Sequence, residues 1–103
     1  MSVSRNHEYP KKDYDLIGFR ISSRYNKKYD AIIKNKQDGT LVYIPFGSRS
    51  PLMQQYKDST GIGAYSHLDH NDKVRRIKFR IRFKGQYDPD YFSPLYFSWV
   101  YLW

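Results

Sequence analysis

Apolar and polar positions alternate along three short stretches in the first half of the chain, at residues 16–22, 29–33 and 41–44. A period of two is typical of β-strands. The Asp38-Gly39 step lies between the second and third stretches and is the strongest hairpin signal in the chain. Pro45 is expected to end the third strand, since proline cannot donate to a sheet. We therefore predict a three-stranded antiparallel meander.

The alternation also predicts which side chains share a face. In the first strand Ile17, Phe19 and Ile21 have the same parity. The second strand places three more apolar side chains on one face, namely Tyr29, Ala31 and Ile33. These two sets are the candidate core of the sheet.

The pattern of residues 73–84 fits two structures. Four apolar residues from Ile77 to Phe83 alternate strictly with basic residues, which predicts a strand. Helix-capping side chains precede the segment, Gly85 follows it, and Val74, Ile77 and Ile81 would share one helical face. The flanks therefore favour a helix, and periodicity alone favours a strand. A shorter helical turn, opened by Pro51, is expected over residues 52–56.

The two ends of the chain show neither period. Residues 1–13 are charged, contain Pro10 and are expected to form an extended N-terminal arm. Residues 89–103 contain Pro89 and Pro94 and are expected to be irregular or short-stranded. The predicted fold is a small single α+β domain over residues 14–103, with a three-stranded antiparallel meander, one or two helices and an irregular aromatic C-terminal tail.

Composition narrows the class of protein. The chain has 103 residues and no cysteine, which excludes disulfide frameworks, cysteine-ligated zinc and thiol catalysis. It has no run of 18 apolar residues and no apolar leader, so we expect neither a membrane span nor a signal peptide. Eleven Tyr, six Phe and two Trp are far more rings than a disordered chain carries.

Nearly all of the net charge of +8 belongs to one segment. Seven cations and no acid lie within residues 73–84, and they are Lys73, Arg75, Arg76, Lys78, Arg80, Arg82 and Lys84. Such a density of like charge favours contact with an anionic partner, either phosphates or an acidic protein surface. The alternative is a solvated basic face. No motif for sequence-specific reading of nucleic acid is present.

We expect no active site, metal or cofactor. His67 and His70 are three residues apart with Asp69 and Asp72 nearby, but zinc needs three or four ligands. A polar turn that satisfies backbone N–H groups before a helix is the better interpretation. Gly61-Ile62-Gly63 lacks the Lys-Ser/Thr step of a phosphate loop. The chain is therefore expected to be non-enzymatic and to have no small-molecule substrate.

Over a third of the rings gather near the C-terminal end of the sequence, at Tyr91, Phe92, Tyr96, Phe97, Trp99, Tyr101 and Trp103. Such a segment would be an aggregation hazard if exposed. It is expected either to complete the protein's own core or to dock into a partner, and the small size of the domain favours the first.

Several motifs resemble those of a small protein family found in the large double-stranded DNA viruses of algae and amoebae. They are KYDAII at 28–33, IPFG at 44–47, QYKD at 55–58, YSHLDHNDKVRR at 65–76 and YFSPLYFSWVYLW at 91–103. The similarity covers roughly residues 5–103. Family members commonly continue the Arg-Arg pair with a helical run that contains a histidine, whereas this chain has Phe83 at the end of that run.

The resemblance implies a viral origin but carries no known activity. It leads to the expectation of a virion-associated structural protein, such as a minor capsid component, that contacts other viral structural proteins. Its expected location is the virion, and the host cytoplasm during assembly. The alternative is non-specific binding of the packaged genome through residues 73–84.

Overall fold

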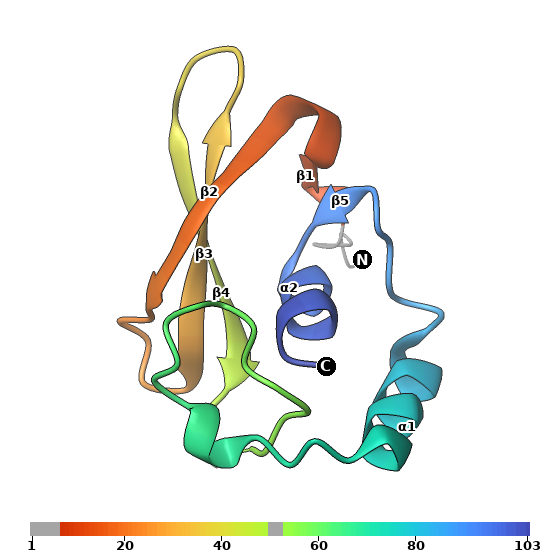
Figure 1. The fold of residues 1–103 in the computed structure, drawn as a ribbon. Coiled ribbons are helices and arrows are strands. Elements are labelled where there is room, and N and C mark those ends of the chain that lie inside the picture. The colour runs from red at the N-terminus through yellow and green to blue at the C-terminus, as the bar shows by residue number, and fades with distance from the viewer. Residues whose placement is uncertain (1–6, 50–52) are drawn as a thin grey trace.

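Two antiparallel sheets and two α-helices form the fold (Figure 1). The structure is a computed structural model and describes residues 7–49 and 53–103. In chain order the elements are β1 (Tyr9–Pro10), the 3₁₀ turn η2 (Lys11–Asp13), β2 (Tyr14–Ile21), β3 (Lys27–Asn35), β4 (Leu41–Ser48), the 3₁₀ turn η3 (Ser66–Leu68), α1 (Lys73–Phe83), β5 (Tyr91–Phe92) and α2 (Pro94–Tyr101). The α+β class and the three-stranded meander β2-β3-β4 are as predicted.

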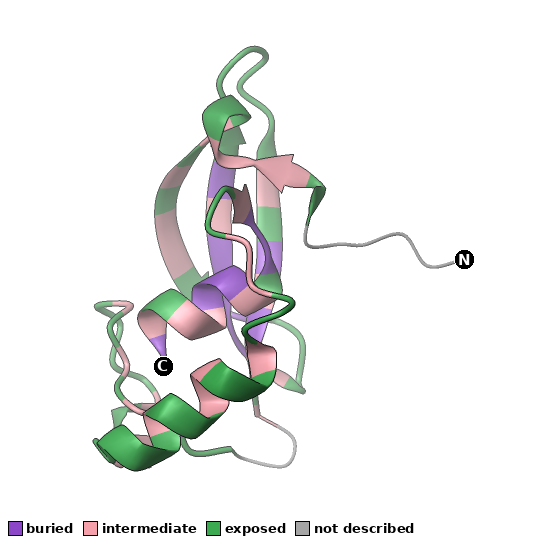
Figure 2. Cartoon of the chain, turned by 90° about the vertical axis from the view of Figure 1, so that its right-hand side faces the viewer, coloured by how far each residue is buried: buried purple, intermediate pink, exposed green. Residues whose placement is uncertain are grey.

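The elements lie in three layers. α2 packs against the meander, and α1 lies on the far side of α2, away from the sheet (Figures 1 and 2). The core lies between sheet and α2 and contains Tyr29, Phe46, Phe92, Phe97 and Leu102, each 5% exposed or less. Within the described residues no helix is long and apolar enough to cross a membrane.

The strands are longer than the alternation predicted. β4 continues through Pro45 to Ser48, so the expectation that proline ends it is wrong. Proline is tolerated there because β4 is an edge strand, and a missing N–H on the outer side breaks no ladder bond. The prediction for the central strand is confirmed, since Tyr29, Ala31 and Ile33 are all fully buried.

A β-bulge changes which side chains of β2 face the core. The register shifts between Leu16 and Gly18. As a result Leu16 and Phe19 pack against the core, while Ile17 is 53% exposed. The bulge breaks the period of two and removes Ile17 from the face of Phe19. Ile21 keeps the parity of Phe19 and lies opposite Tyr29, but it is the last residue of an edge strand and is 54% exposed.

The aromatic segment is regular, which corrects the expectation of an irregular tail. Tyr91–Phe92 forms β5, and Pro94–Tyr101 forms α2. The side chain of Ser93 accepts a hydrogen bond from the backbone N–H of Tyr96, 3.0 Å away, and Pro94 occupies the first helical turn. Serine followed by proline is a helix-start signal, so Pro94 begins a helix here and breaks none.

The described part of the expected N-terminal arm is paired. Tyr9 lies opposite Phe92 and Pro10 opposite Tyr91, which forms the sheet β1-β5. The ring of Tyr9 also packs against the core. Residues 1–6 of that arm lie outside the described residues.

The ambiguous basic segment is helical. The Oδ1 atom of Asp72 accepts from the backbone N–H groups of Val74 at 2.9 Å and Arg75 at 3.3 Å, which caps α1. The flanking residues therefore predicted the structure correctly, and the alternation of residues 77–83 did not. In the predicted turn over residues 52–56, Leu52 lies outside the described residues and residues 53–56 are not helical.

Candidate functional site

Helix α1 divides its basic residues between two faces. Arg76 and Arg80 point toward the rest of the fold, where the Arg76 guanidinium lies 4.8 Å from the ring centre of Tyr56. The Arg80 guanidinium lies 5.2 Å from the ring centre of Trp99 and donates to the backbone oxygen of Trp103 at 3.1 Å. Burial, and then the neighbouring Arg76 charge, lowers the pKa of Arg80. These two arginines belong to the protein's own packing.

Aromatic rings complete the inner face of α1. The rings of Phe79 and Trp103 are stacked, with centres 4.5 Å apart and an angle of 3° between their planes. Tyr87, which follows the end of α1, stacks on Trp99 at 4.0 Å. Since no residue of α1 is fully buried, this row of stacked rings and arginines is what attaches the helix to α2.

The outer face of α1 carries exposed aliphatic side chains. Val74, Ile77 and Ile81 are 60%, 56% and 69% exposed. Most of α1 is coloured as exposed in Figure 2. At 100° per residue these three form one stripe along the helix. The predicted shared face therefore exists, but it faces away from the core.

Five basic residues border this stripe. The helical geometry places Lys78, Arg82 and Arg75 along one side and Lys73 and Lys84 along the other. All five are exposed, although Arg75 also donates to the Oε1 atom of Gln54 at 2.8 Å. We call the combined surface the basic-apolar face, made of Val74, Ile77, Ile81, Lys73, Arg75, Lys78, Arg82 and Lys84.

The aromatic residues of the C-terminal segment complete the protein's own core. Phe92, Tyr96 and Phe97 are buried, and the remaining rings are half-buried at Tyr91, Trp99, Tyr101 and Trp103. These last four touch other rings of the same chain. Intramolecular packing, the favoured alternative for this segment, is what the structure contains.

The His67–Asp72 segment is the polar turn that the sequence predicted. The Nδ1 atom of His70 lies 2.9 Å from the backbone nitrogen of Asp72, and Asp72 in turn caps α1. Asp69 accepts from the Nε2 atom of Gln55 at 2.8 Å and from the backbone N–H of Asp58 at 2.9 Å. Within residues 7–49 and 53–103 no three His, Asp or Glu side chains are grouped as metal ligands.

The fold contains a buried polar network that the sequence patterns did not predict. Lys28 is 1% exposed, and its Nζ atom donates to the backbone oxygen of Met53 at 2.5 Å and to the Oε1 atom of Gln55 at 2.7 Å. The hydroxyl of Tyr29 donates to Asp58. The place of Lys28 on the central strand was the one signal that it could be buried. Lysine is rarely buried, however, so its residue type argued against burial.

The network and the basic-apolar face differ in what they can do. Lys28, Gln55 and Asp69 are mutually satisfied and hold the long loop before α1 against the sheet. The basic-apolar face presents exposed cations and exposed aliphatic groups to solvent, although Arg75 bonds to Gln54 and Arg82 lies over the ring of Phe83, so it is the candidate functional site. Comparisons with protein-family models, with curated proteins and with solved structures found no match for this chain.

Proposed function

We propose that this protein is a non-enzymatic assembly component that docks onto an acidic protein surface through the basic-apolar face of α1. The single observation that carries the proposal is the aliphatic stripe of Val74, Ile77 and Ile81 between two rows of cations. Exposed aliphatic side chains stabilise a complex when binding removes them from water. The rim of cations selects a partner with carboxylates around an apolar patch.

The stripe separates this proposal from genome binding. A surface that contacts only phosphates needs cations and polar groups, and aliphatic side chains between them add nothing to that contact. Protein interfaces combine an apolar centre with a polar rim, which is the arrangement found on α1. Arg76 and Arg80 pack against rings of the same chain, so only five of the seven cations of residues 73–84 point outward.

The virion is the proposed place of assembly, and the host cytoplasm is where docking would begin. Support for this part comes from the resemblance of the motifs at 65–76 and 91–103 to those of viral proteins. A small domain with a rigid aromatic core and one docking helix suits a minor component that fits between larger subunits.

Zero-length carbodiimide crosslinking of purified virions tests the proposal, since it joins lysine amines to carboxylates in direct contact. We expect the chain in the shell fraction after removal of the DNA-containing core. Crosslinks should run from Lys73, Lys78 and Lys84 to carboxylates of another virion protein. Absence from the shell fraction, or loss of the chain together with the DNA, would overturn the proposal.

Matched variants test the apolar stripe. Ile77→Ser and Ile81→Ser should each weaken partner binding about tenfold, because a buried isoleucine contributes roughly 1.5 kcal/mol or more. Val100→Ser is the control, because Val100 is an exposed aliphatic residue on α2. Equal affinities for all three variants would contradict a docking role for the stripe.

Non-specific nucleic-acid binding is the second candidate, favoured by the five outward cations and the lack of acids on α1. If all five contact phosphates, the logarithm of the binding constant for duplex DNA should fall with the logarithm of salt with a slope of about −4.5. Under this alternative Ile81→Ser leaves DNA affinity unchanged, whereas Lys78→Gln reduces the slope by about 1.

A further inference from the structure

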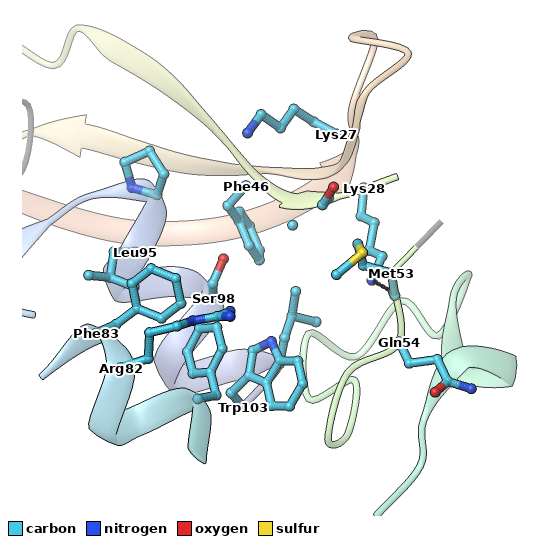
Figure 3. A pocket seen from close by; sticks show the side chains of 15 residues that line it. Lys27, Lys28, Phe46, Met53, Gln54, Arg82, Phe83, Leu95, Ser98 and Trp103 are labelled. Carbon is cyan, nitrogen blue, oxygen red and sulfur yellow. Dashed lines mark hydrogen bonds between the residues drawn. The ribbon is translucent and has the colours of Figure 1, made fainter. Parts of the chain in front are cut away.

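A groove runs beside the basic-apolar face, on the side of α1 that carries Arg75, Lys78 and Arg82. Its deep end is a pocket of about 280 Å³ where the ends of β3 and β4 meet α1 and α2 (Figure 3). Phe46, Leu95 and Trp103 are among the side chains around it. A second, slightly more open hollow, which also borders on Trp103 and Arg82, extends it along α1. We call the pocket and this extension the α1–α2 groove.

The groove combines apolar walls with a cationic rim. Lys27 stands at the sheet side and Arg82 at the helix side of the pocket, and Arg75 and Lys78 line the extension. Among the described residues that line the two hollows, none is Asp or Glu. An occupant must therefore bring both an apolar group for the interior and negative charge for the rim.

The shape of the site also bears on the occupant. A pocket of about 280 Å³ lies beside a more open surface along α1. Single side chains that fill a pocket beside a flatter contact are the usual anchors of protein interfaces. The pocket adjoins the basic-apolar face and shares Arg82 with it, so one partner segment reaches both.

We propose that the α1–α2 groove receives one large apolar side chain, flanked by acidic residues, from a partner protein. This inference rests on the proposed function and names the partner segment that the same docking site recognises. Carboxylates of the segment pair with Arg75, Lys78, Arg82 and Lys27, and the apolar side chain enters between the partly exposed Phe83, Leu95 and Trp103.

Peptide titrations against the full chain test the proposal. Binding is monitored by the fluorescence of the two tryptophans, of which Trp103 lines the groove. The first probe is an acetylated, amidated Asp-Glu-Asp-Phe-Asp-Glu peptide, and the second has Ser in place of Phe. We expect the Phe peptide to bind at least about tenfold more tightly than the Ser peptide. Equal affinities, or no binding of either peptide, would overturn the groove as an anchor site.

Two substitutions on α2, one inside the pocket and one outside it, form a matched pair of variants. Ser98 lines the pocket, so Ser98→Met adds a flexible side chain to it without removing a cation. Val100→Met adds bulk to the exposed side of the same helix. The tenfold preference for Phe should vanish in Ser98→Met and persist in Val100→Met, with both variants melting cooperatively by circular dichroism. Persistence of the preference in Ser98→Met would also overturn the proposal.

The two proposals fail in different ways. Loss of the Phe preference leaves the docking function intact if α1 lysines still crosslink to carboxylates in the virion shell. Absence of those crosslinks removes the docking function, whatever the peptides do.

Discussion

Lys28 is a cationic residue that the fold has placed inside. Its pKa is lowered from 10.5 to about 8 by burial, which the nearby charges of Asp58 and Asp69 oppose. Its two acceptors, the Met53 backbone oxygen and Gln55, match the two N–H groups of a neutral amine. Lys28 can therefore lose its proton without losing either hydrogen bond.

Stability should pass through a maximum near pH 10. Between pH 8 and 10.5 the unfolded chain keeps a proton on Lys28 that the folded protein has released, so the free energy of unfolding rises with pH. Burial, and then the hydrogen bond to Asp58, raises the pKa of Tyr29 from 10.0 to about 12. Above pH 10 the folded protein keeps this proton and the unfolded chain does not, so the free energy of unfolding falls.

Urea denaturation at half-unit pH steps from 7 to 12 measures this profile. Lys28→Met should abolish the rise between pH 8 and 10, and Tyr29→Phe should weaken the fall above pH 10. Burial also raises the pKa of Tyr87 and Tyr101, so part of the fall should remain in Tyr29→Phe. A wild-type profile that is flat from pH 8 to 10 would contradict this account of Lys28.

The network also gives a structural role to three of the sequence motifs. Lys28 and Tyr29 lie in the motif at 28–33, Gln55 and Asp58 in the motif at 55–58, and Asp69 in the motif at 65–76. All of these residues are joined by hydrogen bonds inside the fold. The residues of these motifs therefore specify the structure, and the motifs themselves indicate no chemical activity.

At the scale of elements, α1 is held by one face of stacked rings. Phe79 is the residue of the helix itself that stacks on Trp103, and no residue of the helix is fully buried. Helices with few buried contacts open locally at low free energy. Attachment of α1 should therefore depend on very few side chains.

Phe79→Ala should release α1 without unfolding the sheet. We expect amide protons of residues 76–83 to exchange at least about tenfold faster, because the stacked pair contributes roughly 0.5–1.5 kcal/mol beyond its buried area. Protection in β3 should stay unchanged. Ile81→Ala is the control because Ile81 is exposed. Equal exchange in both variants, or loss of protection in β3, would contradict an independent attachment of α1.

The elements also show where sequence patterns succeed and fail. The alternation of Ile77, Phe79, Ile81 and Phe83 predicted a strand, yet a helix places Phe79 and Phe83 inward and the two isoleucines outward. Local capping by Asp72 and Ser93 decided both helices. The bulge in β2 depends on pairing with β3, which no local pattern carries.

At the scale of the molecule, the C-terminal segment joins three layers into one unit. Leu102 is 1% exposed, and its backbone oxygen accepts from the N–H groups of Tyr56 at 2.9 Å and Lys57 at 3.0 Å. Its side chain reaches the sheet, where a Cβ atom on Gly47 would lie 3.0 Å away. Composition predicted that this segment is buried, but its partners follow from the long-range fold alone.

Leu102→Ala should destabilise the whole molecule. A buried leucine truncated to alanine costs about 2–5 kcal/mol, a large part of the ~5–15 kcal/mol that holds a domain together. Leu41→Ala is the control and should change the free energy of unfolding by less than about 0.5 kcal/mol, because Leu41 is exposed. Urea denaturation followed by circular dichroism compares them. Similar midpoints for the two variants would show that the segment is not part of the cooperative core.

Both edges of the meander are interrupted. Pro45 removes a backbone donor from β4, and the bulge beside Gly18 breaks the regular spacing of β2. An intact edge invites strand addition, whether by a partner's extended segment or by a second copy on the way to a fibril. This protein offers no uninterrupted edge on its meander for such pairing. The docking that we propose uses side chains of α1 and no edge of the meander, so it avoids the polymerisation hazard that backbone pairing brings.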